Sequence, residues 1–242
     1  MSVAAGAAAF AAHSVVYIAE TVPQAFADRL SAQGARVVRE GVIYEESMAA
    51  AEAAAEANGW DLLSDSSWPG YTERPHRLME GYLVLMAEAI AQLAAPPTHI
   101  FLQAGVGGLA TACAALAREA WGNAPRIVVV EPQAAMALHG SIKAGQAVES
   151  PGPVSEMGRL DCKMPSLIAL KGLARDADAY ALISEAEGQA GADMAQTAGL
   201  VSTPSGAAGL AALAALSAEQ RFALGLDGNA SVLCILSEGP ES

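Results

Sequence analysis

The chain has 242 residues, of which 53% are hydrophobic and 16% charged, and its formal net charge is −13. This length allows one large domain or two smaller ones, each with its own hydrophobic core. Thirteen basic residues stand against 26 acidic ones, and no Lys/Arg cluster occurs, so the electrostatic attraction that binds nucleic acids and anionic membranes is missing. We therefore expect neither a nucleic acid nor a membrane surface as partner.

None of the apolar stretches predicts a membrane span. The mean hydropathy of +0.31 comes largely from alanine, which is a helix former as much as a core residue. The two most apolar stretches, residues 83–95 and 101–117, are interrupted by polar residues or glycines before they reach the ~20 apolar residues of a span. The first ten residues lack the basic region of a signal peptide.

The cysteines and histidines form no disulfide or metal pattern. Cys113, Cys162 and Cys234 make neither an even disulfide set nor a metal-ligand spacing, in agreement with a reducing compartment. The four histidines likewise show no ligand spacing. The sequence therefore predicts a cytoplasmic protein without a metal site.

Short runs rich in Val, Ile and Leu alternate with Ala-rich helical runs along the chain. A helix is predicted at residues 3–12, and another at 45–58. Strands are predicted at residues 14–18, 36–39, 60–63, 99–103, 126–131, 179–183 and 231–236. Such βα order, with strands apolar on both faces, predicts an α/β fold: a parallel sheet with helices on both faces.

Helix boundaries are marked by residues that favour starts and stops. Pro23 precedes one predicted helix, and Gly59 follows another. Two capping boxes, Ser184 with Glu187 and Ser217 with Gln220, open later helices. The first helix has no strand before it, although a βαβ unit normally begins with one. We therefore expect that members of this class possess an upstream part that this chain lacks.

A glycine-rich turn joins the strand at 99–103 to a helix. The segment Gln103-Ala-Gly-Val-Gly-Gly-Leu-Ala110 lets backbone amides approach an oxyanion, and the helix start adds unpaired N–H groups and a positive dipole. A phosphate could bind there without any lysine or arginine. Two alternatives stay open: a dinucleotide site, with Glu131 at the end of the next strand as the ribose-binding acid, and a turn made of glycine only for close packing.

Five stretches of the chain resemble the fold type II pyridoxal-phosphate enzymes, and among them the diaminopropionate ammonia-lyases. The matching segments occur in the family's order and span nearly the whole chain. They are Asp65-Ser-Ser-Trp-Pro-Gly-Tyr71 with Pro75 and Gly81-Tyr82 beyond it, Gln103 to Ala110, Val130-Glu-Pro132, Met157 to Ser166, and the pair Ser205 to Leu210 with Leu236 to Gly239. The resemblance implies a fold like that of tryptophan synthase β, truncated at the N-terminus.

The resemblance also implies the roles of particular residues. The cofactor phosphate would be held by the backbone amides of Gly105, Val106, Gly107, Gly108 and Leu109. Ser237 would face the pyridine nitrogen, where a neutral hydroxyl does not force protonation of the ring. Asp65 would lie at the amino end of the substrate. A strand-terminal hydroxyl for Ser237 and an Asx turn for Asp65 are the structural alternatives.

One part of the family pattern cannot be assigned in this chain. The resemblance places the Schiff-base lysine, and an aspartate before a Gly-Asn-His-Gly loop, in a segment that would precede Met1. The chain thus resembles the C-terminal two-thirds of such an enzyme. Its three lysines are Lys143, Lys163 and Lys171. Lys163 lies in a matching motif, but at a position that the family does not use for this bond.

The sequence therefore predicts residues 1–58 as a remnant of a small domain and 59–242 as the large cofactor domain. The resemblance implies a homodimer that binds pyridoxal 5′-phosphate and eliminates ammonia from a small amino acid, with 2,3-diaminopropionate giving pyruvate and ammonia. A threonine/serine dehydratase, a non-catalytic remnant acting as a binding partner, and a nucleotide-dependent oxidoreductase are the alternatives.

Overall fold

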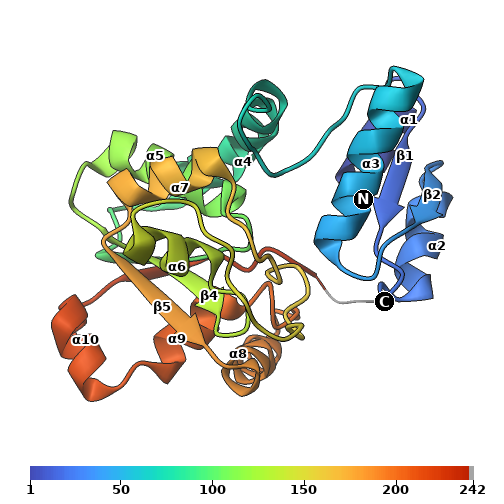
Figure 1. Cartoon of the computed structure of the whole chain (residues 1–242). Helices are drawn as coiled ribbons and strands as arrows, with labels where there is room; N and C mark the ends of the chain where they lie inside the picture. Colours follow the sequence, from blue (N-terminus) through green and yellow to red (C-terminus); the bar gives the residue numbers. More distant parts are fainter. Residues whose placement is uncertain (240–242) are drawn as a thin grey trace. The chain divides into compact units, whose positions relative to one another are not determined.

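The computed structural model describes residues 1–239, and the chain divides into two compact units (Figure 1). The first unit is Met1–Leu63 and the second begins at Ser64. The sequence placed this boundary five residues earlier, after residue 58. Whether the first unit is the remnant of a small domain stays a prediction.

The first unit is a small α/β arrangement. Its two parallel strands pair in register from Val15 with Arg36 to Ile18 with Arg39. Small and aliphatic side chains form its core, among them Ala4, Ile18 and Leu30. The elements in chain order are α1 (Ser2–Ala9), β1 (Val15–Ile18), α2 (Gln24–Ala32), β2 (Arg36–Arg39) and α3 (Tyr44–Asn58).

Two expectations for the first unit need correction. The opening helix ends at Ala9 and not at residue 12, because the chain turns at Ala11, where φ is +54°. Residues 60–63 form no strand, and within the described residues no strand pairs with them. Instead, the N–H group of Trp60 donates to the carbonyl of Ala55, since Gly59 ends α3 in the left-handed region.

The second unit carries a four-stranded parallel sheet in the order β5-β4-β3-β6. Its strands are β3 (His99–Gln103), β4 (Arg126–Pro132), β5 (Ala179–Ile183) and β6 (Val232–Cys234), the last shorter than the predicted 231–236. Its helices are α4 (Glu73–Gln92), α5 (Gly108–Trp121), α6 (Ala137–Ala144), α7 (Leu167–Asp176), α8 (Glu185–Thr197), α9 (Ala208–Ala215) and α10 (Ala218–Leu224).

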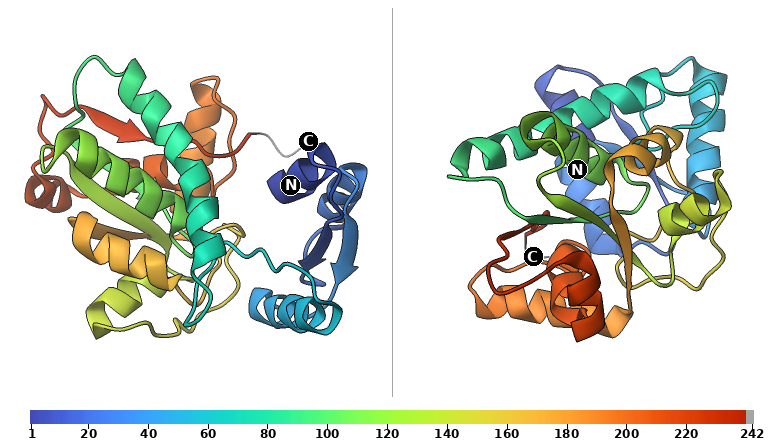
Figure 2. Two further views of the ribbon diagram at one scale, coloured as in Figure 1. Left: turned by 90° about the horizontal axis from the view of Figure 1, so that it is seen from above. Right: turned by 90° about the vertical axis from the view of Figure 1, so that its left-hand side faces the viewer.

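Alternating side chains of the buried strands build one core on each face of this sheet. Ile100 and Leu102 pack with α4, α5 and α7, whereas Phe101 packs with α9 on the opposite face. The right-hand view of Figure 2 shows the helices from α4 to α6 on one side of the strands and α8 and α9 on the other. The predicted parallel sheet with helices on both faces is thus confirmed.

The predicted helix caps are present. Ser184 and Glu187 bond reciprocally at the start of α8, as do Ser217 and Gln220 at the start of α10. Each pair satisfies two amide groups that have no partner within the helix. No helix among the described residues is both long and apolar enough to cross a bilayer.

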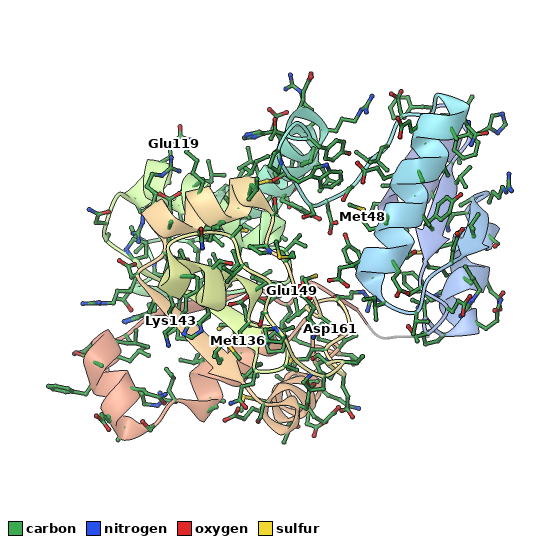
Figure 3. The ribbon with its side chains drawn as sticks, in the orientation of Figure 1. Met48, Glu119, Met136, Lys143, Glu149 and Asp161 are labelled. Atoms are coloured by element: carbon green, nitrogen blue, oxygen red, sulfur yellow. The ribbon has the colours of Figure 1, made fainter. Side chains whose placement is uncertain are left out.

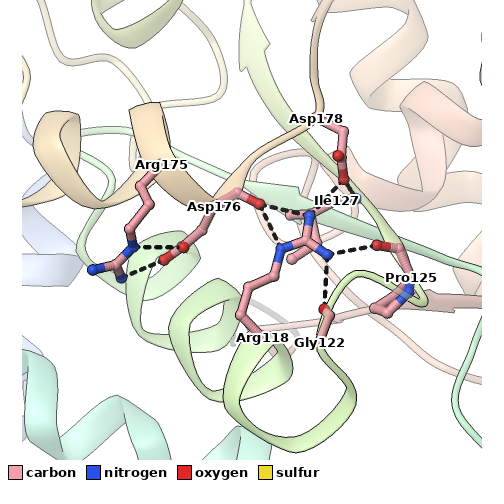
Figure 4. Close-up of polar contacts among 7 residues, drawn as sticks. All are labelled: Arg118, Gly122, Pro125, Ile127, Arg175, Asp176 and Asp178. Atoms are coloured by element: carbon pink, nitrogen blue, oxygen red, sulfur yellow. Dashed lines mark hydrogen bonds and ion pairs between the residues drawn. The ribbon is translucent and has the colours of Figure 1, made fainter.

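A polar network fixes the amino ends of β4 and β5 (Figure 4). The Arg118 guanidinium on α5 donates to the carbonyls of Asp176 and Pro125, and it lies 2.6 Å from the Asp178 carboxylate. Asp178 also accepts from the N–H of Ile127 in β4. This network occupies the amino edge of the sheet. In parallel α/β sheets, ligands bind at the carboxyl ends of the strands, so we expect a binding site at the opposite edge.

Candidate functional site

The glycine turn follows β3 at the carboxyl edge of the sheet in the second unit. Gln103 is the last residue of β3 and Gly108 the first of α5, so four residues form the whole connection. Gly107 precedes the helix with φ of +98°, a conformation that favours glycine. The turn therefore places the amino end of α5 at this edge.

Consecutive amide groups of the turn have no acceptor. Within residues 1–239, no carbonyl or side-chain oxygen accepts a hydrogen bond from the N–H groups of residues 105–109. Val106, Gly107 and Gly108 are buried, and a buried amide without a partner costs about 1–3 kcal/mol. A phosphate offers several acceptor oxygens to such a row, and the dipole of α5 attracts its charge. The residues present thus fit a phosphate group.

Glycine is also required here for packing. A Cβ at Gly105 would lie 2.9 Å from the carbonyl oxygen of Arg159, and one at Gly107 would lie 2.9 Å from atoms of Ala169 and Leu138. A Cβ at Gly108 would meet nothing closer than 3.6 Å. Close packing therefore explains two of the three glycines on the Cβ side, while the unpaired N–H groups of the turn remain to be explained by a ligand.

The segment of Asp65 lies beside the turn. The carbonyl oxygen of Asp65 is 4.0 Å from the Cβ position of Gly108, and Tyr82 of α4 is 3.7 Å from it. Burial, together with the Asp65 carboxylate, raises the pKa of the Tyr82 hydroxyl. The structure thus brings the backbone of Asp65 to the turn, and this residue is exposed. Tyr82 lies beside the turn as well. It belongs to a matching motif, but the resemblance gave it no role.

Two buried serines attach the Asp65 segment to the turn. The hydroxyls of Ser67 and Ser166 are 2.7 Å apart, although 99 residues separate them in the chain. Ser67 also accepts from the N–H of Ile168 at the start of α7, and the N–H of Ser166 donates to the carbonyl of Val106. These bonds hold the Asp65 segment, the glycine turn and α7 in one arrangement.

Ser237 reaches the same edge from the segment after β6. Its hydroxyl oxygen lies 2.9 Å from the amide nitrogen of the Gln103 side chain, and its N–H donates to the carbonyl of Gly206. Gln103 is buried, whereas Ser237 is exposed. The structure therefore brings Asp65, residues 105–109 and Ser237 to the surroundings of one sheet edge.

Glu131 has a structural task. Its carboxylate is only 1% exposed, and its two oxygens accept from the N–H groups of Leu138 at 2.7 Å and His139 at 2.8 Å. These amides belong to the first turn of α6, so the carboxylate caps that helix. Because both oxygens are engaged inside the protein, the structure favours the structural interpretation of Glu131 over a ribose-binding acid.

Glu131 is expected to make folding stability depend on pH. Burial raises the pKa of this carboxyl from 4.5 to about 7, against the two amide bonds, which lower it. The folded chain then binds the proton more tightly than the unfolded chain, so the free energy of unfolding falls as pH rises between these two values. We expect Glu131→Gln to abolish this fall, which amounts to as much as about 3 kcal/mol.

Urea unfolding at about pH 4.5 and about pH 8 measures this dependence in both proteins. The matched control is Glu119→Gln, at an exposed site near the carboxyl end of α5. It is expected to keep the fall seen in the unchanged chain. An equal fall in Glu131→Gln would contradict the assignment.

The lysines of the chain are engaged elsewhere or exposed. Lys163 lies 2.6 Å from the Asp161 carboxylate and donates to the carbonyls of Ala134 and Pro153. Lys143 and Lys171 are exposed on α6 and α7. Figure 3 shows Lys143 on α6 and Asp161 in the long connection after that helix. We therefore assign the Schiff-base bond to none of these three lysines.

Comparisons with known proteins show the family to which the chain belongs. The family model described as "Pyridoxal-phosphate dependent enzyme" matches residues 1–238. The chain belongs to this family. Diaminopropionate ammonia-lyase from Salmonella typhimurium is 32% identical over 250 residues, covering 95% of this chain and 61% of the relative. The Escherichia coli enzyme is 28% identical over 244 residues, covering 94% and 61%. The chain thus spans about 61% of the length of these relatives.

Solved structures of the family share the fold. A crystal structure of the Escherichia coli diaminopropionate ammonia-lyase superposes with a TM-score of 0.91 at 26% identity, covering 98% of this chain and 64% of that one. A threonine deaminase from Solanum lycopersicum gives 0.84 at 20% identity, covering 99% and 66%, which shows the shared fold alone. The fold type II resemblance drawn from the sequence is therefore confirmed.

Proposed function

We propose that this chain binds pyridoxal 5′-phosphate and takes part in the elimination of ammonia from a small amino acid. The substrate we propose is 2,3-diaminopropionate, which with one water gives pyruvate and two molecules of ammonia. The observation that carries the proposal is the row of unpaired amides at residues 105–109. The similarity to diaminopropionate ammonia-lyases over 95% of the chain supports the choice of reaction.

Each proposed site residue has a task that its position allows. The amides of residues 105–109 bind the phosphate and so fix one end of the cofactor. The Ser237 hydroxyl bonds the pyridine nitrogen at the other end. Asp65 pairs with an ammonium group of the substrate. The cofactor itself, when bound, supplies the electron sink that the elimination needs.

A dehydratase that acts on serine or threonine is a second candidate. A human serine dehydratase-like protein is 28% identical over 171 residues, covering 68% of this chain and 50% of the relative, and it favours this alternative. Both candidates concern degradation of a small amino acid. We also propose a cytoplasmic location, because none of the three cysteines forms a disulfide. We propose a homodimer because the family resemblance implies this assembly.

Ligand titration tests the proposed function. Pyridoxal phosphate followed by absorbance is expected to saturate with one ligand per chain, whereas NADH followed by fluorescence is expected not to bind. Saturable NADH binding without pyridoxal phosphate binding would contradict the proposal. Release of the 2-oxo acid, measured with the cofactor present, then separates the two candidate reactions: 2,3-diaminopropionate and serine give pyruvate, and threonine gives 2-oxobutyrate.

Asp65 is expected to contribute moderately to substrate affinity. In the chain saturated with pyridoxal phosphate, Asp65→Asn should weaken binding of 2,3-diaminopropionate by about twofold to fivefold, because an exposed ion pair is worth about 1 kcal/mol at most. Isothermal titration measures this. The matched control, Glu119→Gln, removes an exposed carboxylate near the other end of α5 and should have no effect. Equal affinities of Asp65→Asn and the unchanged chain would remove Asp65 from the site.

A further inference from the structure

Helix α4 covers the core with one face and leaves the opposite face exposed. Met79 and Met86 are buried, and Met86 packs into the core beside α5. The opposite face carries residues spaced by four and three positions, a spacing that is typical of helices packed in pairs. Its five members, all exposed, form what we call the outer seam: Arg77, Gly81, Val84, Glu88 and Ala91.

Contacts within the chain do not explain the middle of the outer seam. Gly81 lies in the interior of α4, where glycine destabilises a helix relative to alanine. Apart from the backbone of α4 itself, no described residue brings an atom within 4 Å of its Cβ position, so packing inside the chain does not require glycine there. Val84, three residues on, is 60% exposed. A gap beside a protruding side chain suits a second helix that approaches this face closely.

An antiparallel copy of α4 complements the outer seam. A two-fold axis between residues 82 and 83 sets Val84 of each copy opposite Gly81 of the other. The same axis sets Arg77 opposite Glu88, because these two residues are equally far from it along the helix. The protruding valine then meets the gap at glycine, and opposite charges meet on both sides of the centre.

The two charged side chains of the outer seam are accessible to a partner. Arg77 pairs with Glu80 of its own helix at 3.0 Å, and the two side chains are 71% and 54% exposed. A pair so exposed to water is weakly held. Glu88 is exposed and has no ion pair with any residue between 1 and 239. An antiparallel copy would therefore give Glu88 a cation and Arg77 a second carboxylate.

We propose that two copies of this chain pair through α4, with their outer seams antiparallel. This inference rests on the homodimer of the proposed function and names its contact surface. Each copy has a formal net charge of −13, so two copies repel each other unless their contact surface is locally complementary. The outer seam carries one guanidinium and one carboxylate, so it contributes no net charge and is complementary to itself.

Charge exchange tests this pairing. Sedimentation velocity of the full chain over a concentration series measures the dimer dissociation constant. Arg77→Glu sets carboxylates against each other at both ends of the paired seams, and Glu88→Arg sets guanidinium groups against each other, so each should weaken the dimer at least about tenfold. An equal mixture of the two variants should dimerise like the unchanged chain, because one copy then carries both carboxylates and the other both guanidinium groups.

Matched variants separate the seam from net charge and from the fold. Lys171→Glu and Glu119→Arg make the same charge changes at exposed sites on α7 and α5, and should leave the dissociation constant within about threefold at physiological salt. Val84→Glu sets a charge over the gap at Gly81 and should weaken the dimer. Since Val84 is exposed in the single chain, its thermal unfolding under monomeric conditions should stay unchanged.

The possible results point to different conclusions. A dimer that the seam variants leave intact, or a mixture of Arg77→Glu with Glu88→Arg that fails to pair, would overturn this inference and leave the homodimer in place. A chain that stays monomeric at every concentration would overturn the homodimer as well. Saturable binding of pyridoxal phosphate is measured separately, so its absence from a chain that dimerises as described would overturn the proposed function alone.

Discussion

Gly107→Ala is expected to lower the free energy of unfolding by about 2–6 kcal/mol and to abolish pyridoxal phosphate binding. At φ of +98° any side chain is strained, by about 1–3 kcal/mol. The added Cβ would also lie 2.9 Å from Ala169 and from Leu138, both in the packed core, and overpacking costs about 1–3 kcal/mol more. Relief of this clash would move the amides that we assign to the phosphate.

Two glycines provide matched controls for this result. Gly145 also has a positive φ, +68°, but nothing lies within 4 Å of its Cβ position, so Gly145→Ala should cost only the backbone strain. Gly108→Ala, at the first residue of α5, adds a Cβ with ordinary contacts and should keep the fold. Urea unfolding measures all three variants. An equal loss of stability in Gly107→Ala and Gly145→Ala would contradict the packing argument.

Pyridoxal, which lacks the phosphate, is expected to bind at least about 100-fold more weakly than pyridoxal phosphate. A hydrogen bond to a charged group contributes about 1.5–3 kcal/mol, so loss of only two of the proposed amide bonds already gives this factor. Competition at equilibrium against the absorbance of bound pyridoxal phosphate measures the ratio. No lysine or arginine of the turn contributes, because residues 104–110 contain none.

4-Deoxypyridoxine 5′-phosphate serves as the control ligand. It keeps the phosphate but has no aldehyde, so it cannot form an imine with a lysine. We expect it to bind within about tenfold of pyridoxal phosphate, since the amides make the same bonds with it. If pyridoxal binds well and the deoxy compound does not, the ligand is held by an imine with one of the chain's three lysines, and the amide site is wrong.

The strands at 99–103 and 126–131 could be predicted because burial on both faces leaves an apolar run, residues 100–102 in the first and 127–130 in the second. Residues 60–63 form a similar short run, yet they make no strand. A strand also needs a partner, and pairing depends on segments distant in sequence, which a local pattern does not report. There Trp60 and Leu63 are 43% and 47% exposed, so the apolar run does not mark burial either.

Only part of the site could be predicted from the sequence. The glycine turn could be found because strand, turn and helix are adjacent in the chain and their chemistry is local. Asp65 and Ser237 came from the family resemblance. The bond between Gln103 and Ser237 spans 134 residues, and the cap of α6 by Glu131 depends on burial, so neither has a local signal. Tyr82 was part of a matching motif, but only the fold places it beside Gly108.

Amide NMR of the ¹⁵N-labelled chain tests the central claim most directly. On addition of pyridoxal phosphate, we expect the largest shifts at the backbone amides of residues 105–109, and inorganic phosphate should reproduce part of them. If the signals of these amides do not shift while the signals of residues around Lys143, Lys163 or Lys171 do, the cofactor binds elsewhere. That result would contradict a phosphate site at the turn after β3.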